Sequence, residues 1–157
     1  MLMQSLLEEV SLKHFPNPPA SLQQIEEFER RMGWRLDSEL RAFYLHCDGA
    51  DLFKRPGSPY IFLPLAEIVR ARVVFLGEDD DKYGPPSLYA VCDVQDGDYV
   101  LVDTATQDDG HYAIIDGWHE GFPDPKYHRR IARSFSEFLA EALRSGGYQF
   151  WLNRSGT

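Results

Sequence analysis

Apolar residues near the N-terminus recur three and four positions apart, which is the spacing that lines one face of a helix. These residues are Met3, Leu6, Leu7 and Val10. We therefore predict an amphipathic helix over residues 2–13. The prolines that follow favour a stiff, extended linker, because proline has a fixed φ and restricts the residue before it. They are Pro16, Pro18 and Pro19.

Two further helices are predicted between residues 21 and 49, each with a recognisable first residue. Ser21 and Gln24 form a capping box, in which both side chains accept hydrogen bonds from free backbone N–H groups, and Gly33 is expected to end this helix. Asp37 is a preferred first residue for the next helix, which Gly49 is expected to close. The apolar stripes are Leu22, Ile25, Phe28 and Met32 in the first helix, and Leu40, Phe43, Tyr44 and Cys47 in the second.

Short apolar runs replace the helical period after residue 60, and they predict strands. Asp96-Gly97 is the central pair of a two-residue loop and favours a type I′ hairpin, because both positions need positive φ. The runs on either side of it are almost continuously apolar, so we expect their strands to be covered on both faces. The predicted strands are 60–63, 72–76, 88–94, 99–102 and 111–115, with a helical turn or irregular bridge over 65–70.

A second capping box, Ser134 with Glu137, predicts a closing helix that ends before Gly146. Its apolar face contains Phe135, Phe138, Leu139 and Leu143. The aromatic segment 148–152 is expected to pack back on the domain. Helices, then strands joined by hairpin-length connections, then one closing helix predict an α+β fold, in which helices pack against a mostly antiparallel β-sheet.

Five segments between about residues 20 and 145 match, in order, the motifs of one superfamily. They are Ser21–Gly33 (SLQQIEEFERRMG), Leu36–Gly49 (LDSELRAFYLHCDG), Phe62–Ile68 (FLPLAEI), Asp96–Asp98 (DGD) and Ile131–Leu139 (IARSFSEFL). On these segments the chain resembles the SUKH superfamily, which includes Knr-type fungal cell-wall assembly regulators and bacterial immunity proteins. Asp37 and Asp48 stand where the superfamily usually has proline and asparagine, but both can cap or turn a helix end. The resemblance implies the same α+β fold.

The length of 157 residues fits one domain. We predict a single SUKH-like domain over 1–157, with a core at about 20–145, the N-terminal helix at 2–13 and an aromatic tail at 146–157. No apolar run approaches the roughly 20 residues that span a bilayer. The N-terminus has no basic residue before Lys13, which makes it a poor signal peptide. We therefore expect a cytoplasmic protein.

The residues that carry chemistry form no recognised catalytic or metal-binding pattern. Gly110 and Gly117 are isolated, so there is no phosphate-binding loop. Cys47 and Cys92 have no neighbouring cysteine for zinc, and the aspartates around residue 96 lack the spacing of a calcium loop. We predict no enzymatic activity, no cofactor and no metal. A hydrolase that uses Cys47 or Cys92 is the alternative, which rapid labelling by a thiol reagent would favour.

Charge is distributed unevenly along the chain, whose formal net charge is −9. Residues 78–124 hold thirteen acids and one base, whereas the rest of the chain holds twelve acids and fifteen bases. Aromatic residues interleave with these acids. Such a surface suits a basic partner, because charge speeds the encounter and buried aromatics supply affinity. A solvated acidic face that only aids solubility is the alternative. Phosphate repulsion disfavours direct nucleic-acid or anionic-membrane binding.

We predict a non-enzymatic intracellular binding protein, and the resemblance implies that it is an immunity protein that neutralises a toxin. Its acidic surface suggests that it occludes the active site of a basic toxin, for example a nuclease. The alternative is a regulatory or scaffolding protein like the fungal regulators. An edge strand or the aromatic tail can support a homodimer, so both monomer and homodimer stay open. The candidate partner-binding residues are Asp79, Asp80, Asp81, Asp96, Asp98, Asp108 and Asp109, which would steer the partner, and Tyr112 and Trp118, which would anchor it.

Overall fold

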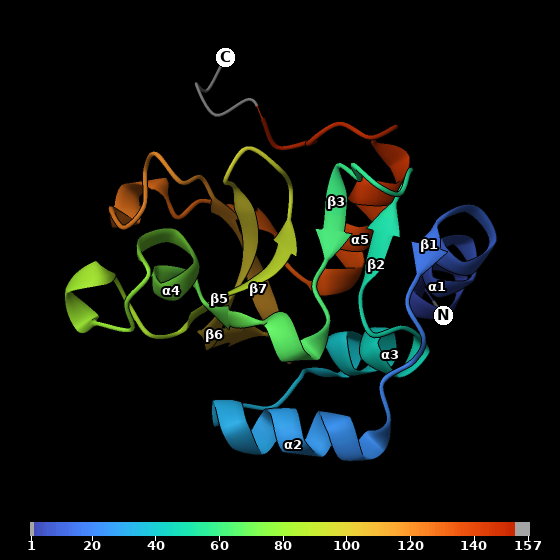
Figure 1. Ribbon diagram of the computed structural model, residues 1–157, viewed down its shortest axis with the longest axis horizontal. Helices are drawn as coiled ribbons and strands as arrows, with labels where there is room; N and C mark the ends of the chain where they lie inside the picture. The colour runs from blue at the N-terminus through green and yellow to red at the C-terminus, as the bar shows by residue number, and fades with distance from the viewer. Residues whose placement is uncertain (1, 153–157) are drawn as a thin grey trace.

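The computed structural model describes residues 2–152, and its strands form one antiparallel sheet with helices packed against it (Figure 1), which confirms the α+β fold. The sheet order is β1-β2-β3-β5-β6-β7-β8, and β4 pairs with the same strand, β5, that β3 pairs with. The strands are β1 (Phe15–Pro16), β2 (Ala50–Leu52), β3 (Tyr60–Phe62), β4 (Val69–Arg70), β5 (Leu88–Asp93), β6 (Tyr99–Asp108), β7 (His111–Gly117) and β8 (Arg130–Ala132). The helices are α1 (Leu2–Lys13), α2 (Leu22–Met32), α3 (Ser38–His46), α4 (Ala71–Leu76) and α5 (Phe135–Arg144), with short 3-10 turns η1 (Leu65–Glu67), η2 (Asp81–Tyr83) and η3 (Pro125–Tyr127).

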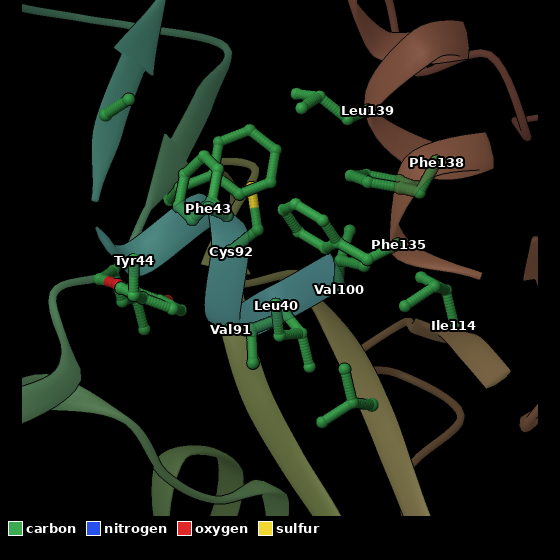
Figure 2. Packing of buried hydrophobic residues seen from close by; sticks show 14 of the residues in the cluster. Leu40, Phe43, Tyr44, Val91, Cys92, Val100, Ile114, Phe135, Phe138 and Leu139 are labelled. Carbon is green, nitrogen blue, oxygen red and sulfur yellow. The ribbon is translucent and has the colours of Figure 1, made fainter. Parts of the chain in front are cut away.

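The central strands are buried on both faces, as their apolar sequences predict. The larger hydrophobic cluster lies between the sheet and the helices α1, α3 and α5, and Figure 2 shows rings from α3 and α5 meeting over the strands. The smaller cluster covers the other face, beneath α4 and the loop 117–128. Neighbouring residues of β6 alternate between the two, because successive side chains of a strand point to opposite faces. Val100 and Val102 enter the larger cluster, and Leu101 enters the smaller one.

The first turn of α3 connects three elements. Asp37 Oδ1 accepts hydrogen bonds from the backbone N–H groups of Glu39 at 3.1 Å and Leu40 at 2.9 Å. Its second oxygen accepts from the Tyr112 N–H of β7 at 3.0 Å. Glu39 in turn accepts from the N–H and hydroxyl of Ser136 at the start of α5, at 2.9 and 2.7 Å. Asp37, where the family motif usually has proline, therefore joins α3 to the sheet through a contact that proline cannot make.

The segment after α3 is equally constrained. Asp48 Oδ1 accepts from the Leu65 N–H at 2.9 Å, and the Asp48 N–H donates to the Pro18 carbonyl at 2.9 Å. Gly49 has φ +91°, and a Cβ there would lie 2.5 Å from the Phe62 carbonyl oxygen. Only glycine fits this position. The proline-rich linker, α3 and β3 thus meet at residues 48 and 49.

The local signals for helices and hairpin are largely confirmed. Ser21 and Gln24 form the reciprocal capping box, and Gly33 ends α2 in the left-handed conformation. In the hairpin, Asp96 and Gly97 both have positive φ, and the Asp98 N–H donates to the Gln95 carbonyl at 3.1 Å. The aromatic tail packs back through Trp151, which is 6% exposed, although Tyr148 is 78% exposed.

The predicted strand at 72–76 is wrong, because these residues form α4. The run contains two valines and a phenylalanine, so its intrinsic preference is for a strand. The helix instead places Ala71 in the smaller cluster and lets the Arg72 side chain bond the following loop. These tertiary contacts override the local propensity.

Three end details also differ from the sequence predictions. Leu22 is 56% exposed, since it is the first residue of α2, before the buried part of the helix. The helix α3 ends at His46 rather than near Gly49, because the Asp48 N–H donates to the Pro18 carbonyl of the proline linker instead of continuing the helical pattern. Ser134 caps α5, but Glu137 accepts from the Arg133 N–H instead of completing the predicted box.

His14 fixes the outer edge of the sheet, at the end of β2. Its Nδ1 accepts a hydrogen bond from the Phe53 N–H at 2.9 Å, and the two rings meet edge to face at 4.9 Å. Phe53 has φ +72°, a conformation that a bulky residue rarely adopts, so it needs such contacts. An accepting ring nitrogen carries no proton. Burial lowers the pKa of His14 below its ordinary value of 6.5, which keeps the ring neutral.

We expect Asp37→Ala to lower the free energy of unfolding by about 2–4 kcal/mol, because it removes a helix cap and leaves the buried Tyr112 N–H without an acceptor. Ser134→Ala is the matched control, since the Ser134 hydroxyl caps α5 and otherwise contacts only the Ser136 hydroxyl of the same helix, so its loss should cost about 1 kcal/mol. Urea unfolding followed by circular dichroism measures both. Equal losses in the two variants would contradict the bridging role of Asp37.

His14 should make the fold sensitive to mild acid. Because its pKa is lower in the folded protein, its contribution to stability is complete above pH 6.5 and is lost as pH falls from there toward the folded pKa. In His14→Asn the amide oxygen still accepts from the Phe53 N–H but does not titrate. Wild type should therefore lose more unfolding free energy than this variant between pH 7 and pH 5, as measured by urea denaturation. Parallel curves would contradict this assignment.

Candidate functional site

The structure places the carboxylates predicted to steer a partner at two separate ends of the sheet. Asp96 and Asp98 lie in the turn before β6, whereas Asp108 and Asp109 lie at its far end. A strand rises about 3.3 Å per residue, so the ten residues of β6 separate the two groups by roughly 30 Å. The expectation that all these carboxylates form one face is therefore wrong.

Three loops that carry most of the other acids do adjoin one another. A Cβ on Gly84 would lie 3.4 Å from the Pro123 Cβ, and one on Gly97 would lie 3.5 Å from the His119 ring. We call the surface formed by residues 77–87, 94–98 and 117–128 the acidic loop surface. Its 77–87 and 117–128 parts lie on the left of Figure 1, on either side of α4. Its exposed acids are Glu78, Asp79, Asp80, Asp81, Asp96, Glu120 and Asp124, and its exposed lysines are Lys82 and Lys126.

A buried arginine holds the first of these loops. Arg72, 5% exposed, donates from Nε to Asp79 at 2.8 Å and from Nη1 to Asp81 at 2.8 Å. It also donates to the Gly84 carbonyl at 3.1 Å. Arg70 binds the other oxygen of Asp79 at 2.8 Å. The hydrogen bond from Arg72 lowers the pKa of Asp79, which stays ionised.

These ion pairs divide the three consecutive aspartates by role. Asp79 is ion-paired with Arg70 and Arg72, and Asp81 with Arg72, so both aspartates mainly fix the loop. Asp80 has no ion pair with described residues, and its carboxylate accepts only a local hydrogen bond from the Lys82 N–H at 2.9 Å. The charge that this loop presents outward therefore comes largely from Asp80 and Glu78.

Asp98 and Tyr112 are internal, which removes them from the predicted partner-binding set. Asp98 is 8% exposed, and one of its oxygens accepts the His119 N–H at 2.9 Å and lies 2.7 Å from His119 Nδ1. It thereby ties the β5–β6 turn to the loop 117–128. Tyr112 is 5% exposed, its hydroxyl donates to the Arg35 carbonyl at 2.7 Å, and its ring packs edge to face on Trp34.

Trp118 is the predicted anchor that does lie on the acidic loop surface. It is half-buried, and its ring meets that of Tyr127 edge to face at 5.3 Å. Tyr127 is 37% exposed and lies under the Lys126 ammonium, 5.0 Å from the ring centre. We call this pair of packed rings, Trp118 and Tyr127, the aromatic step; it lies among carboxylates of the acidic loop surface.

Sequence reasoning missed Tyr127 and the two residues that position the loops, Arg72 and His119. The available signal for Arg72 was the pair Arg70 and Arg72 shortly before a run of four acids. The strand prediction for 72–76 hid it.

The cysteines are unsuited to nucleophilic chemistry. Both are free and buried. Burial raises the pKa of Cys47 to about 12, and it raises the pKa of Cys92 as well, so neither is a thiolate near neutral pH. His46 Nε2 is bonded to the Ser11 hydroxyl on α1 at 2.7 Å. The hydrolase alternative therefore has no support in the geometry.

The described part of the chain holds neither a cluster of metal-ligand residues nor a membrane-spanning helix. Within residues 2–152, no three His, Cys, Asp or Glu side chains gather in a group that could hold a metal ion. Within the same range, no helix combines the length and apolar character that crossing a membrane requires.

Comparison with known proteins agrees with the fold. No curated protein matches the chain. The model of the SMI1 / KNR4 family (SUKH-1) matches residues 19–141, which is more than half of the chain. The matched range includes the capped helices α2 and α3, the whole sheet except β1, and most of α5. The chain therefore belongs to the SMI1 / KNR4 family (SUKH-1), a family of immunity and regulatory proteins.

Proposed function

We propose that this chain is an immunity protein that binds a basic protein toxin through the acidic loop surface and blocks access to the toxin's active site. The observation that carries the proposal is the gathering of seven exposed acids and an aromatic step on three adjoining loops. Of the residues predicted from the sequence, Asp80, Asp96 and Trp118 are proposed to contact the partner, whereas Asp79 and Asp81 hold the loop in place. Glu78, Glu120, Asp124 and Tyr127 are added to the proposed contact residues.

The acids would act mainly before contact. Opposite charge raises association rates from about 10⁵–10⁶ M⁻¹s⁻¹ toward 10⁸ M⁻¹s⁻¹ or more at low salt, whereas screening limits this effect to about 10 Å at 0.1 M salt. The binding affinity would come mainly from the aromatic step, because a few aromatic anchors contribute most of the binding free energy at an interface. Trp118 and Tyr127 are already fixed against each other, so binding would freeze little additional side-chain motion.

The loops are held in place before any partner arrives. Arg72 fixes residues 79–84 through two carboxylates and a carbonyl, and Asp98 fixes the hairpin turn to His119. A surface that is already ordered loses less conformational entropy when it binds a partner. Occlusion of an active site requires such a stable surface rather than any chemistry of its own.

The cysteines fit an intracellular site of action. A reducing compartment keeps thiols free, and both cysteines are unpaired. An immunity protein would act in the cytoplasm of the cell that makes the toxin.

Co-expression with the product of the neighbouring gene should yield a complex that co-purifies and whose association slows as salt is raised. Asp80→Asn, Asp96→Asn and Glu120→Gln together remove three outward charges without touching the Arg72 or His119 contacts. We expect this triple variant to associate roughly tenfold more slowly at low salt, with a flatter salt dependence, measured by surface plasmon resonance.

Asp108→Asn with Asp109→Asn is the control, because these residues lie at the other end of β6 and asparagine tolerates the positive φ of Asp109. This pair should leave the association rate nearly unchanged. A stronger effect from the control than from the triple variant would move the interface to the β6–β7 hairpin. An isolated gene with no toxin beside it would instead favour a regulatory or scaffolding role.

A further inference from the structure

A pocket of about 360 Å³ lies between the edge strand β8 and the C-terminal tail, outside the acidic loop surface. Among residues 2–152, two arginines and three apolar or aromatic residues line it. They are Arg129, Arg130, Ile131, Phe150 and Trp151. In a protein with a net charge of −9, a pocket whose described lining residues include two arginines and no carboxylate is unexpected.

The tryptophan of this pocket has an unused donor. Trp151 is 6% exposed and packs against Phe138 and Phe150, with ring centres 5.6 and 4.9 Å apart. Its indole Nε1–H is buried and has no acceptor among the described residues. A buried N–H without an acceptor costs about 1–3 kcal/mol, so an acceptor that reached it would be favoured.

The two arginines have different surroundings. The Arg129 carbonyl accepts from the Asp116 N–H of β7 at 2.8 Å, and the Arg129 guanidinium donates to the Trp151 carbonyl. Arg129 thus fixes the tail against β8. Arg130 is exposed and has no ion pair with described residues. A guanidinium only donates hydrogen bonds, and its planar fork matches a carboxylate.

A second tryptophan provides an internal comparison. Trp34 also has a buried Nε1–H without an acceptor among the described residues, and it lines a pocket with Arg30 and Arg35. That pocket contains Glu26 and Glu29 as well, whose charges would repel an anion. The pocket at Trp151 has the same kinds of donor, and none of its described lining residues is an acid.

We propose that the β8–tail pocket binds an organic monocarboxylate with an apolar body. The carboxylate would accept from the Arg130 guanidinium. It would also accept from the Trp151 indole N–H once a side-chain movement exposes this buried group, and the apolar body would pack on Ile131 and Phe150. Both a free organic acid and the C-terminal residue of a peptide have this chemistry. A bare inorganic anion lacks the apolar body and would bind more weakly.

The three indole N–H resonances of the full chain test this directly by NMR, after assignment with single Trp→Phe variants. Titration with benzoate, which represents a free acid, or with N-acetylphenylalanine, which represents a peptide C-terminus, should shift the Trp151 resonance saturably and leave Trp34 in place. The tighter of the two probes identifies the source. Arg130→Gln should weaken binding about tenfold, the expected loss of a charge-assisted pair.

Arg133→Gln is the matched control, because Arg133 is an exposed arginine three residues away that does not line the pocket. It should bind the probe like wild type, and exposure of both arginines means that neither change threatens folding. The proposal is overturned if Trp151 does not shift, if Trp34 shifts equally, if Arg130→Gln binds as wild type does, or if inorganic phosphate binds as tightly as the carboxylates.

Discussion

A sheet that is apolar on both faces is the constraint on which the rest of this structure depends. The strands β5, β6 and β7 send alternate side chains into two separate clusters, so each face needs its own cover. The helices α1, α3 and α5 provide it on one side, and α4 with the loop 117–128 provides it on the other. Each Å² of apolar surface removed from water stabilises the fold by roughly 25 cal/mol, so the elements that cover either face contribute to stability. The loop that carries Trp118 and Tyr127 is therefore anchored by Phe122 in the smaller cluster, and its polar residues are left at the rim.

The motifs that identify the family turn out to be structural positions. Ser21 caps α2, Asp37 joins α3 to β7, Gly49 allows close approach to β3, and Asp96-Gly97 makes the hairpin turn. None of them needs a partner to explain its presence. Membership of the family thus accounts for the fold, while function must be argued from the surface that the fold presents.

The sequence predicted what is decided locally and failed where distant residues decide. Caps, the turn glycine and helical spacing act within a few residues, so α1, α2, α3, α5 and the β5–β6 hairpin follow from the sequence. The strand predicted at 72–76 failed because Arg72 bonds a loop seven to twelve residues away. Only some residues of the candidate partner site could be predicted from the sequence, for a related reason. Nearness along the chain does not distinguish Asp96 from Asp98, yet one points to solvent and the other is buried against His119. Tyr112 is internal because its hydroxyl donates to the Arg35 carbonyl and its ring packs on Trp34, whereas Trp118, just after the end of β7, is half-buried.

The loops separate the residues that hold them from the residues that face outward. Arg72 and Asp98 point inward and carry the contacts, while Asp80, Asp96 and Glu120 point outward and have few. Exposed positions of this kind usually tolerate replacement within about 0.5 kcal/mol of stability. Under the proposed immunity function, single substitutions at these exposed positions would change which toxin is bound while the fold is kept.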